Sequence, residues 1–140
     1  MRRRGGLGRF AAGWLLCLAA LSCAGETRNQ NLTEVKRASA GALEVVLLSP
    51  TGALHHGRDT FFIEFRSVPG GALVDVGPVK ATASMSMSGS PMLGSLDVMR
   101  SDTPGRYAAT SDLSMAGAWR LTLEWNGASP GTVTFSGSVQ

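Results

Sequence analysis

The chain is poor in cysteine, histidine and aromatic residues. Its 140 residues include two cysteines, two histidines and one tyrosine. Because Cys17 and Cys23 both lie near the N-terminus, no disulfide can stabilise the region that follows them. We find no cysteine available as a nucleophile, no glycine-rich phosphate loop and no spacing of metal-hydrolase ligands. We therefore expect that the protein is not an enzyme.

Basic residues are also scarce once the N-terminal segment is set aside. The full chain has 13 basic and 10 acidic residues, but four of the arginines fall within the first nine positions. The chain from Cys23 onward therefore keeps nine basic residues against ten acidic ones, a formal charge of −1. It has no Lys/Arg cluster, which argues against a nucleic-acid partner.

The chain contains one long apolar run, residues 10–21, directly after the arginine-rich start. This pattern is typical of a signal peptide, here predicted over residues 1–22. The alternative is a transmembrane helix, but the run is shorter than the roughly 20 residues that span a bilayer. We therefore expect an exported protein.

The sequence Ala20-Leu21-Ser22-Cys23 resembles a bacterial lipobox, in which the cysteine becomes lipidated. The alternative is ordinary cleavage nearby, which leaves Cys23 as a stray thiol or removes it. Acylation predicts attachment through Cys23 to a membrane, on the periplasmic side of the bacterial envelope. Ala24 provides no acidic retention signal after the cysteine, which favours the outer membrane. Residues 23–41 are polar and are expected to form a flexible tether to a domain at 42–140.

The body of the chain alternates apolar and polar residues with a period of two, which is typical of half-buried strands. The clearest example is Trp119, Leu121, Leu123 and Trp125, which alternate with polar residues. Glycine- and proline-containing turns separate such runs at short intervals. We predict strands at 42–48, 60–66, 73–77, 79–87, 95–100, 105–111 and 118–125, with an eighth at 131–138. This pattern favours an all-β fold, an immunoglobulin-like antiparallel sandwich.

Methionines are concentrated in one segment, MSMSGSPM, at residues 85–92. Counting along the strand by two places Met85 and Met87 on the apolar face, where methionine commonly fills gaps in a core. However, the turn at 89–91 ends the alternation beside Met87, and Met92 can fold back toward that end. Because thioether sulfur suits Cu(I), the segment also fits a soft-metal site. The residues leave both interpretations open.

Three further residues are weaker candidates for metal ligands. His55 and His56 lie in a predicted loop, where paired histidines are usually solvated although imidazole is a common metal ligand. Met115 precedes the turn into the tryptophan-rich strand and is expected at one end of the sandwich. The sequence does not indicate which end.

Two stretches, GPVKATASMSMSGSPM and TPGRYAATSDLSMAGAWRLTLEW, resemble the YtkA-like family, which is related to FixH. The resemblance implies an envelope-exposed β-sandwich with a link to copper or other metal handling. It also aligns Met85, Met87 and Met92 with the family's methionine-rich loop, and Met115 with its second methionine. This chain has Ser86, Ser88 and Ser90 where the richest family members carry further ligands.

Two functional hypotheses follow. In the first, the chain is an exported, membrane-anchored binding module that holds Cu(I) through Met85, Met87 and Met92, with Met115, His55 or His56 as additional ligands. Its partner would be a metal-transport or envelope protein. In the second, it is a structural or protein-interaction module without a metal, and the methionines form packing or a docking edge.

Overall fold

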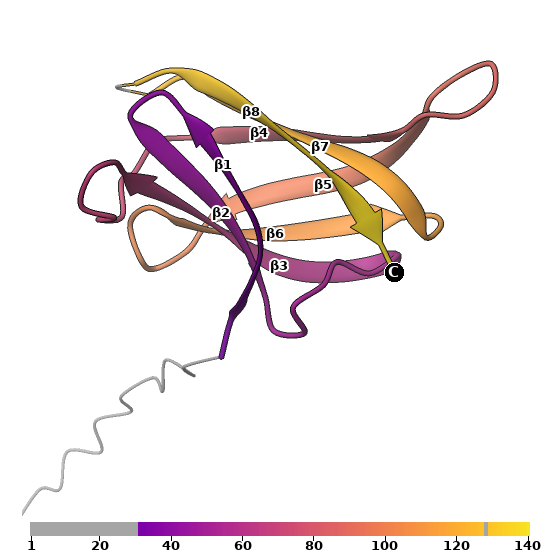
Figure 1. Cartoon of the computed structure of the whole chain (residues 1–140), viewed down its shortest axis with the longest axis horizontal. Helices are drawn as coiled ribbons and strands as arrows, with labels where there is room; N and C mark the ends of the chain where they lie inside the picture. Colours follow the sequence, from indigo (N-terminus) through magenta and orange to yellow (C-terminus); the bar gives the residue numbers. More distant parts are fainter. Residues whose placement is uncertain (1–30, 128) are drawn as a thin grey trace, which may run out of the picture.

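The computed structural model describes residues 31–127 and 129–140, which form eight antiparallel strands (Figure 1). The strands are β1 (Thr33–Ala40), β2 (Leu43–Ser49), β3 (Gly57–Ser67), β4 (Val79–Met85), β5 (Met92–Arg100), β6 (Arg106–Leu113), β7 (Gly117–Trp125) and β8 (Gly131–Val139). This part of the chain has no helix long and apolar enough to cross a membrane. The predicted signal peptide, residues 1–22, and Cys23 lie outside the described residues.

The strands are hydrogen-bonded in the order β1-β2-β3-β6-β5-β4-β7-β8 and fold into two layers. One layer contains β1, β2, β3, β6 and most of β5, and the other contains β4, β7 and β8. The two end strands approach each other, where Lys36 Nζ of β1 donates to the Ser136 carbonyl of β8. The predicted all-β, immunoglobulin-like sandwich is confirmed.

The two layers are joined by β5, which passes from one to the other at Gly94. Residues 92–94 pair with β4, whereas residues 95–100 pair with β6. A Cβ atom at Gly94 would lie 2.5 Å from Leu113 Cδ2 and 3.0 Å from Trp119 Cζ3. Glycine therefore lets the strand pass close to the core where it changes layer.

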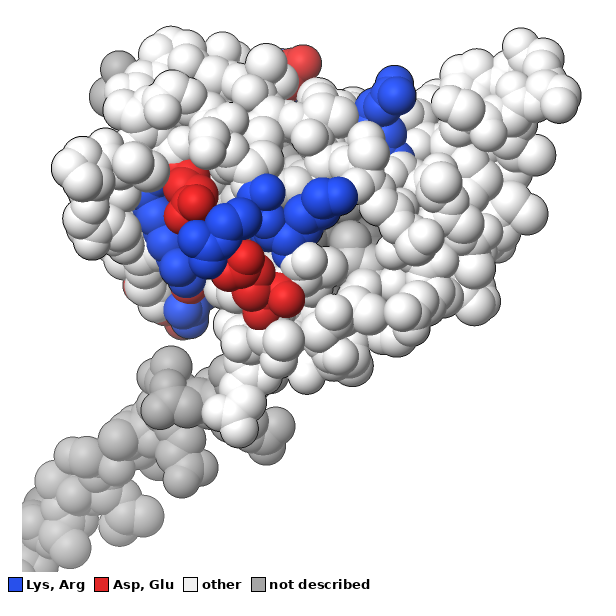
Figure 2. All heavy atoms as spheres, viewed as in Figure 1, with Lys and Arg blue, Asp and Glu red and all other residues white. Residues whose placement is uncertain are grey.

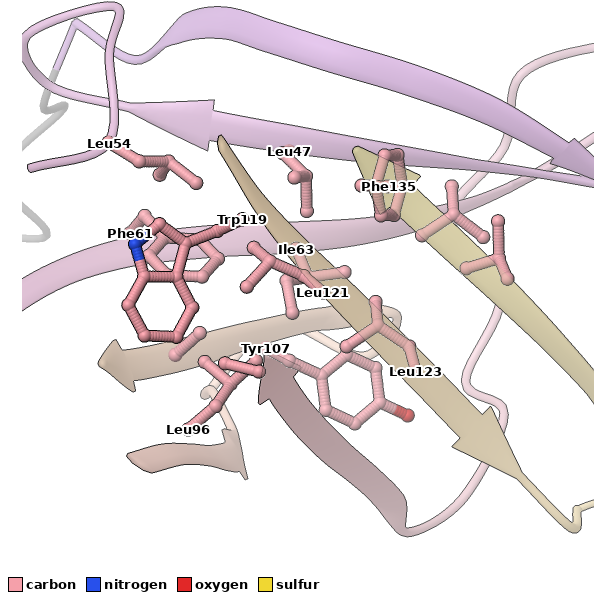
Figure 3. Close-up of a cluster of buried hydrophobic side chains, with 14 of the residues drawn as sticks. Leu47, Leu54, Phe61, Ile63, Leu96, Tyr107, Trp119, Leu121, Leu123 and Phe135 are labelled. Atoms are coloured by element: carbon pink, nitrogen blue, oxygen red, sulfur yellow. The ribbon is translucent and has the colours of Figure 1, made fainter. Parts of the chain in front are cut away.

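The core lies between the layers and is built from the alternating residues of each strand (Figure 3). From β3 come Phe61, Ile63 and Phe65, and from β7 come Trp119, Leu121, Leu123 and Trp125, all of them buried. Phe65 packs edge-on against both Trp125 and Tyr107, with ring centroids 5.0 and 5.3 Å apart. The period-two pattern therefore identified the inward faces of β3 and β7 correctly.

Three predicted segments differ from the structure. The strand expected at 79–87 ends at Met85, so Met87, expected on the apolar face, lies in the hairpin loop and is exposed. Residues 33–40, expected to belong to the tether, form β1, an edge strand in which no side chain is fully buried. Residues 73–77, expected to form a strand, make only one isolated bridge, between Leu73 and Arg66. An edge strand pairs with only one neighbouring strand and leaves more of its side chains in water, so it needs few apolar residues. The polar composition of residues 33–40 therefore did not reveal β1.

Tyr107 holds in place residues 75–77 of the segment between β3 and β4, where a strand was expected. Its hydroxyl oxygen accepts the Val76 N–H at 3.2 Å and lies 2.8 Å from Gly77 O and 3.1 Å from Asp75 Oδ1. The Gly77 N–H also bonds Asp75, and this bond, followed by that of Tyr107, lowers the pKa of the Asp75 carboxyl. Side-chain hydrogen bonds thus satisfy the N–H groups of Val76 and Gly77 and the Gly77 carbonyl in place of a strand ladder.

The outer face of the larger layer carries a network of charged side chains around Glu64, a buried carboxylate that is 3 % exposed. One Glu64 oxygen accepts from Arg66 Nε at 2.9 Å, and the other accepts from Arg106 Nε at 2.8 Å. Each arginine adds a second bond through its Nη2. Charged side chains gather in one area of the face seen in Figure 2, while the β4–β5 hairpin at its right is uncharged.

Candidate metal centre

The methionines of interest are brought together at one end of the sandwich by the pairing of the strands. In the β4–β5 hairpin, Met85 lies directly opposite Met92. On its other side, Met85 pairs with Trp119 of the neighbouring strand β7. The β6–β7 turn, residues 114–116, lies next to this hairpin because β7 begins at Gly117. We call the hairpin 85–92 and the turn 114–116 the methionine end; both lie toward the right of Figure 1.

Met85 and Met92 are the two inner methionines of this end. Met85 is 9 % exposed, and its methyl carbon lies 2.5 Å from where a Cβ would sit at Gly117. Glycine at position 117 therefore makes room for the Met85 thioether. Met92 is half-buried and packs against the core, and its Sδ accepts a hydrogen bond from Ser114 Oγ at 3.0 Å.

Met87 and Met115 are the two outer methionines, 48 % and 41 % exposed. Met87 lies in the hairpin loop, two residues beyond Met85. Met115 lies in the β6–β7 turn, which is held in place because Trp119 Nε1 donates to the Met115 carbonyl at 2.9 Å. The methionine end therefore contains one buried thioether, one half-buried thioether and two exposed ones. All four are neutral sulfur donors, which suit Cu(I).

His55 and His56 lie in the β2–β3 loop, which is at the same end of the strands because Gly57, the first residue of β3, pairs with Leu113. His55 Nε2 is 2.9 Å from Thr51 Oγ1, and His56 Nδ1 is 2.8 Å from the Gln140 carbonyl. One ring nitrogen of each histidine is thus occupied by a local hydrogen bond. Within residues 31–127 and 129–140, no three His, Cys, Asp or Glu side chains form a group that could hold a metal.

A family model described as YtkA-like matches residues 37–124 of the chain, which is more than half of its length. The chain belongs to the YtkA-like family. No curated protein and no solved structure gave a significant match. The YtkA-like region begins within β1, contains β2 to β6 and all of β7 except its last residue, and includes all four methionines of the methionine end.

Sequence reasoning missed two residues of this YtkA-like domain that contact the methionines. Trp119 was assigned to the core, where it lies, but its indole N–H also fixes the turn that carries Met115. Ser114 was not considered, and its hydroxyl contacts the Met92 sulfur. The sequence contained no signal for this contact, because residues 92 and 114 are brought together only when β5 pairs with both β4 and β6.

Proposed function

We propose that this YtkA-like chain is an exported, membrane-anchored β-sandwich module that binds Cu(I) through the methionines of its methionine end. The observation that supports it most is the contact of Ser114 with the Met92 sulfur, which brings the turn that carries Met115 against the hairpin that carries Met87 and Met92. Thioethers are soft, neutral ligands that do not require deprotonation, and among common metal ions they favour Cu(I).

The four methionines suit different roles in such a site. Met85 is almost fully buried and packs against Gly117, so it supports the hairpin from the core side. Met87, Met92 and Met115 reach solvent and are the proposed ligands. His55 or His56 could join through its other ring nitrogen, Nδ1 or Nε2 respectively, while keeping its bond to Thr51 or Gln140.

A Cu(I) titration against a competing chromogenic chelator, under anaerobic reducing conditions, tests this proposal. The protein is the full chain with Cys17→Ser and Cys23→Ser, because a thiolate would itself bind Cu(I). We expect one Cu(I) per chain. Changing Met87, Met92 and Met115 together to leucine is expected to weaken binding by about tenfold or more, since three thioethers are lost.

Two controls accompany the titration. The triple variant should stay folded, because exchange of methionine for leucine keeps side-chain volume and costs less than about 1.5 kcal/mol per site. Met99→Leu changes a methionine on the outer face of β5 that is 71 % exposed. This variant should bind Cu(I) as the chain with only the two cysteine changes does. If the chain that carries only the two cysteine changes cannot compete with the chelator, the copper proposal fails.

The second candidate function is a protein-interaction module of the cell envelope. It is supported by the exposure of Leu93 next to Met92, together with the exposure of Met87 and Met115. Exposed apolar side chains grouped at one end are typical of docking sites, and methionine adapts well to different partners. This function would remain if the chain does not bind Cu(I).

The membrane anchor has its own test. We expect Cys23→Ser to abolish incorporation of labelled palmitate into the protein, because the variant has no thiol to acylate at that position. Labelling of a bacterial host followed by immunoprecipitation would measure the loss. Cys17→Ser is the matched control and should keep the label. Equal labelling of the Cys23 variant would contradict the proposed anchor.

A further inference from the structure

The contact between Ser114 and Met92 links the β6–β7 turn to the hairpin that carries three of the methionines. Ser114 is exposed, so water is available to its hydroxyl, yet the hydroxyl donates to Met92 Sδ at 3.0 Å. Thioether sulfur is only a weak acceptor. The contact therefore places a proton donor directly against a sulfur that the proposed function assigns as a ligand.

A thioether sulfur has two lone pairs, and a hydrogen bond to one of them occupies that pair and lowers the electron density that the sulfur can donate to a metal. Met92 packs against the core on one side, and the Ser114 hydroxyl covers the sulfur from the turn. We propose that Ser114 is a gate on the Met92 sulfur: its hydroxyl holds one lone pair of the sulfur in the metal-free protein and thereby competes with Cu(I) for the sulfur. This inference rests on the proposed function.

The gate predicts the direction of a mutational effect. Removing the hydroxyl with Ser114→Ala makes the sulfur available without a competing donor, so Cu(I) should bind more tightly. The expected gain is about two- to tenfold, which corresponds to the net strength of one hydrogen bond. If Ser114 only supported the local structure, its removal would loosen the hairpin, and binding would weaken or stay the same.

The turn has a second attachment that keeps it in place in this variant. The bond from Trp119 Nε1 to the Met115 carbonyl, at 2.9 Å, involves neither Ser114 nor Met92. Ser114 is also exposed, so its replacement leaves no buried polar group without a partner. Loss of the hydroxyl should therefore change the environment of the Met92 sulfur while the fold is retained.

The first experiment compares Cu(I) affinities of Ser114→Ala, Ser114→Thr and the parent, each in the full chain with both cysteines changed to serine. Ser114→Thr keeps a hydroxyl and is the matched control, expected to bind as the parent does. Tighter binding by the alanine variant alone supports the gate. Unchanged or weaker binding by the alanine variant overturns it, while binding by the parent leaves the proposed function standing.

The second experiment needs no metal. Hydrogen peroxide transfers one oxygen atom to a thioether, which becomes a sulfoxide while the peroxide becomes water, and the sulfur lone pair forms the new bond. We expect Met92 to oxidise about two- to tenfold faster in Ser114→Ala than in the parent, because the competing hydrogen bond is lost. Met87 and Met115 serve as internal references, and peptide mass spectrometry measures all three rates.

The two experiments separate the failure of the inference from that of the proposed function. An unchanged Met92 oxidation rate in Ser114→Ala would show that the hydroxyl does not hold the sulfur, which overturns the gate whatever the copper result. A parent that does not bind Cu(I) would overturn the proposed function and the gating role with it. Faster Met92 oxidation together with tighter Cu(I) binding is the result that supports the gate.

Discussion

Replacing Trp125 with alanine is expected to lower the free energy of unfolding by about 3–5 kcal/mol, the usual range for a buried tryptophan. Trp125 is 1 % exposed and packs edge-on against Phe65, with ring centroids 5.0 Å apart. Its Nε1 also donates to the Ser129 carbonyl at 2.7 Å, which closes the β7–β8 turn. The variant loses the ring, the hydrogen bond and the close contact with Gly131, whose Cβ position lies 2.5 Å from Trp125 Cζ2.

Urea denaturation followed by circular dichroism would measure this loss. Trp125→Phe is the matched control, because it keeps an aromatic ring but removes the indole N–H, and it should cost less than the alanine variant. Trp125 ends β7, whereas the methionine end lies beside the start of that strand. A folded alanine variant should therefore keep the Cu(I) affinity of the parent. A loss of less than about 1 kcal/mol would mean that the core collapses around the missing ring.

The strand faces were predictable from the sequence because alternation reports directly on which side chains point inward. This holds for Phe61, Ile63 and Phe65, and for the tryptophan strand. It fails for β1, whose outer face is stabilised by charge pairs between Arg37 and both Glu34 and Glu44. Such pairs have no periodic apolar signal, so a polar edge strand resembles a tether in sequence.

The candidate site was predictable only in part. The sequence indicated that Met85 faces the core and that Met92 can return toward the strand end, and the register places these two residues opposite each other. The end occupied by Met115 was not predictable, because it depends on how β6 and β7 pair with distant strands. The contact of Ser114 with Met92 depends in addition on the change of layer at Gly94, a property of the folded chain.

Among changes to charged residues, the largest effect on stability is expected when Arg66 and Arg106 are changed together to methionine. This double variant would leave the Glu64 carboxylate buried without either of its partners. We expect it to lower the free energy of unfolding at neutral pH by about 3–5 kcal/mol, the usual effect of leaving one buried charge unpaired. Methionine retains most of the apolar stem of arginine, so the loss reports on charge more than on packing.

The pH dependence of this loss follows from the pKa of Glu64. Burial alone raises that pKa, but hydrogen bonds from Arg66 and Arg106, with the attraction of their charges, outweigh burial and lower it below its usual value of 4.5. In the parent, the Glu64 network therefore stabilises the fold above pH 4.5, and this contribution is lost as the pH falls toward the lowered pKa. In the double variant burial acts unopposed and the folded-state pKa rises, so stability is lost as the pH increases through it.

The difference in stability between the parent and the double variant should consequently shrink as the pH is lowered from neutral to below 4.5. A triple variant, with Glu64→Met added, separates charge from shape. Its three methionines would lie beside Val46, which is fully buried on this outer face, and replacing a buried ionic group by apolar residues is often neutral or stabilising. We expect the triple variant to regain most of the stability lost by the double variant. If it remains as unstable as the double variant, the arginines act mainly through packing, and the buried carboxylate is not the source of the loss.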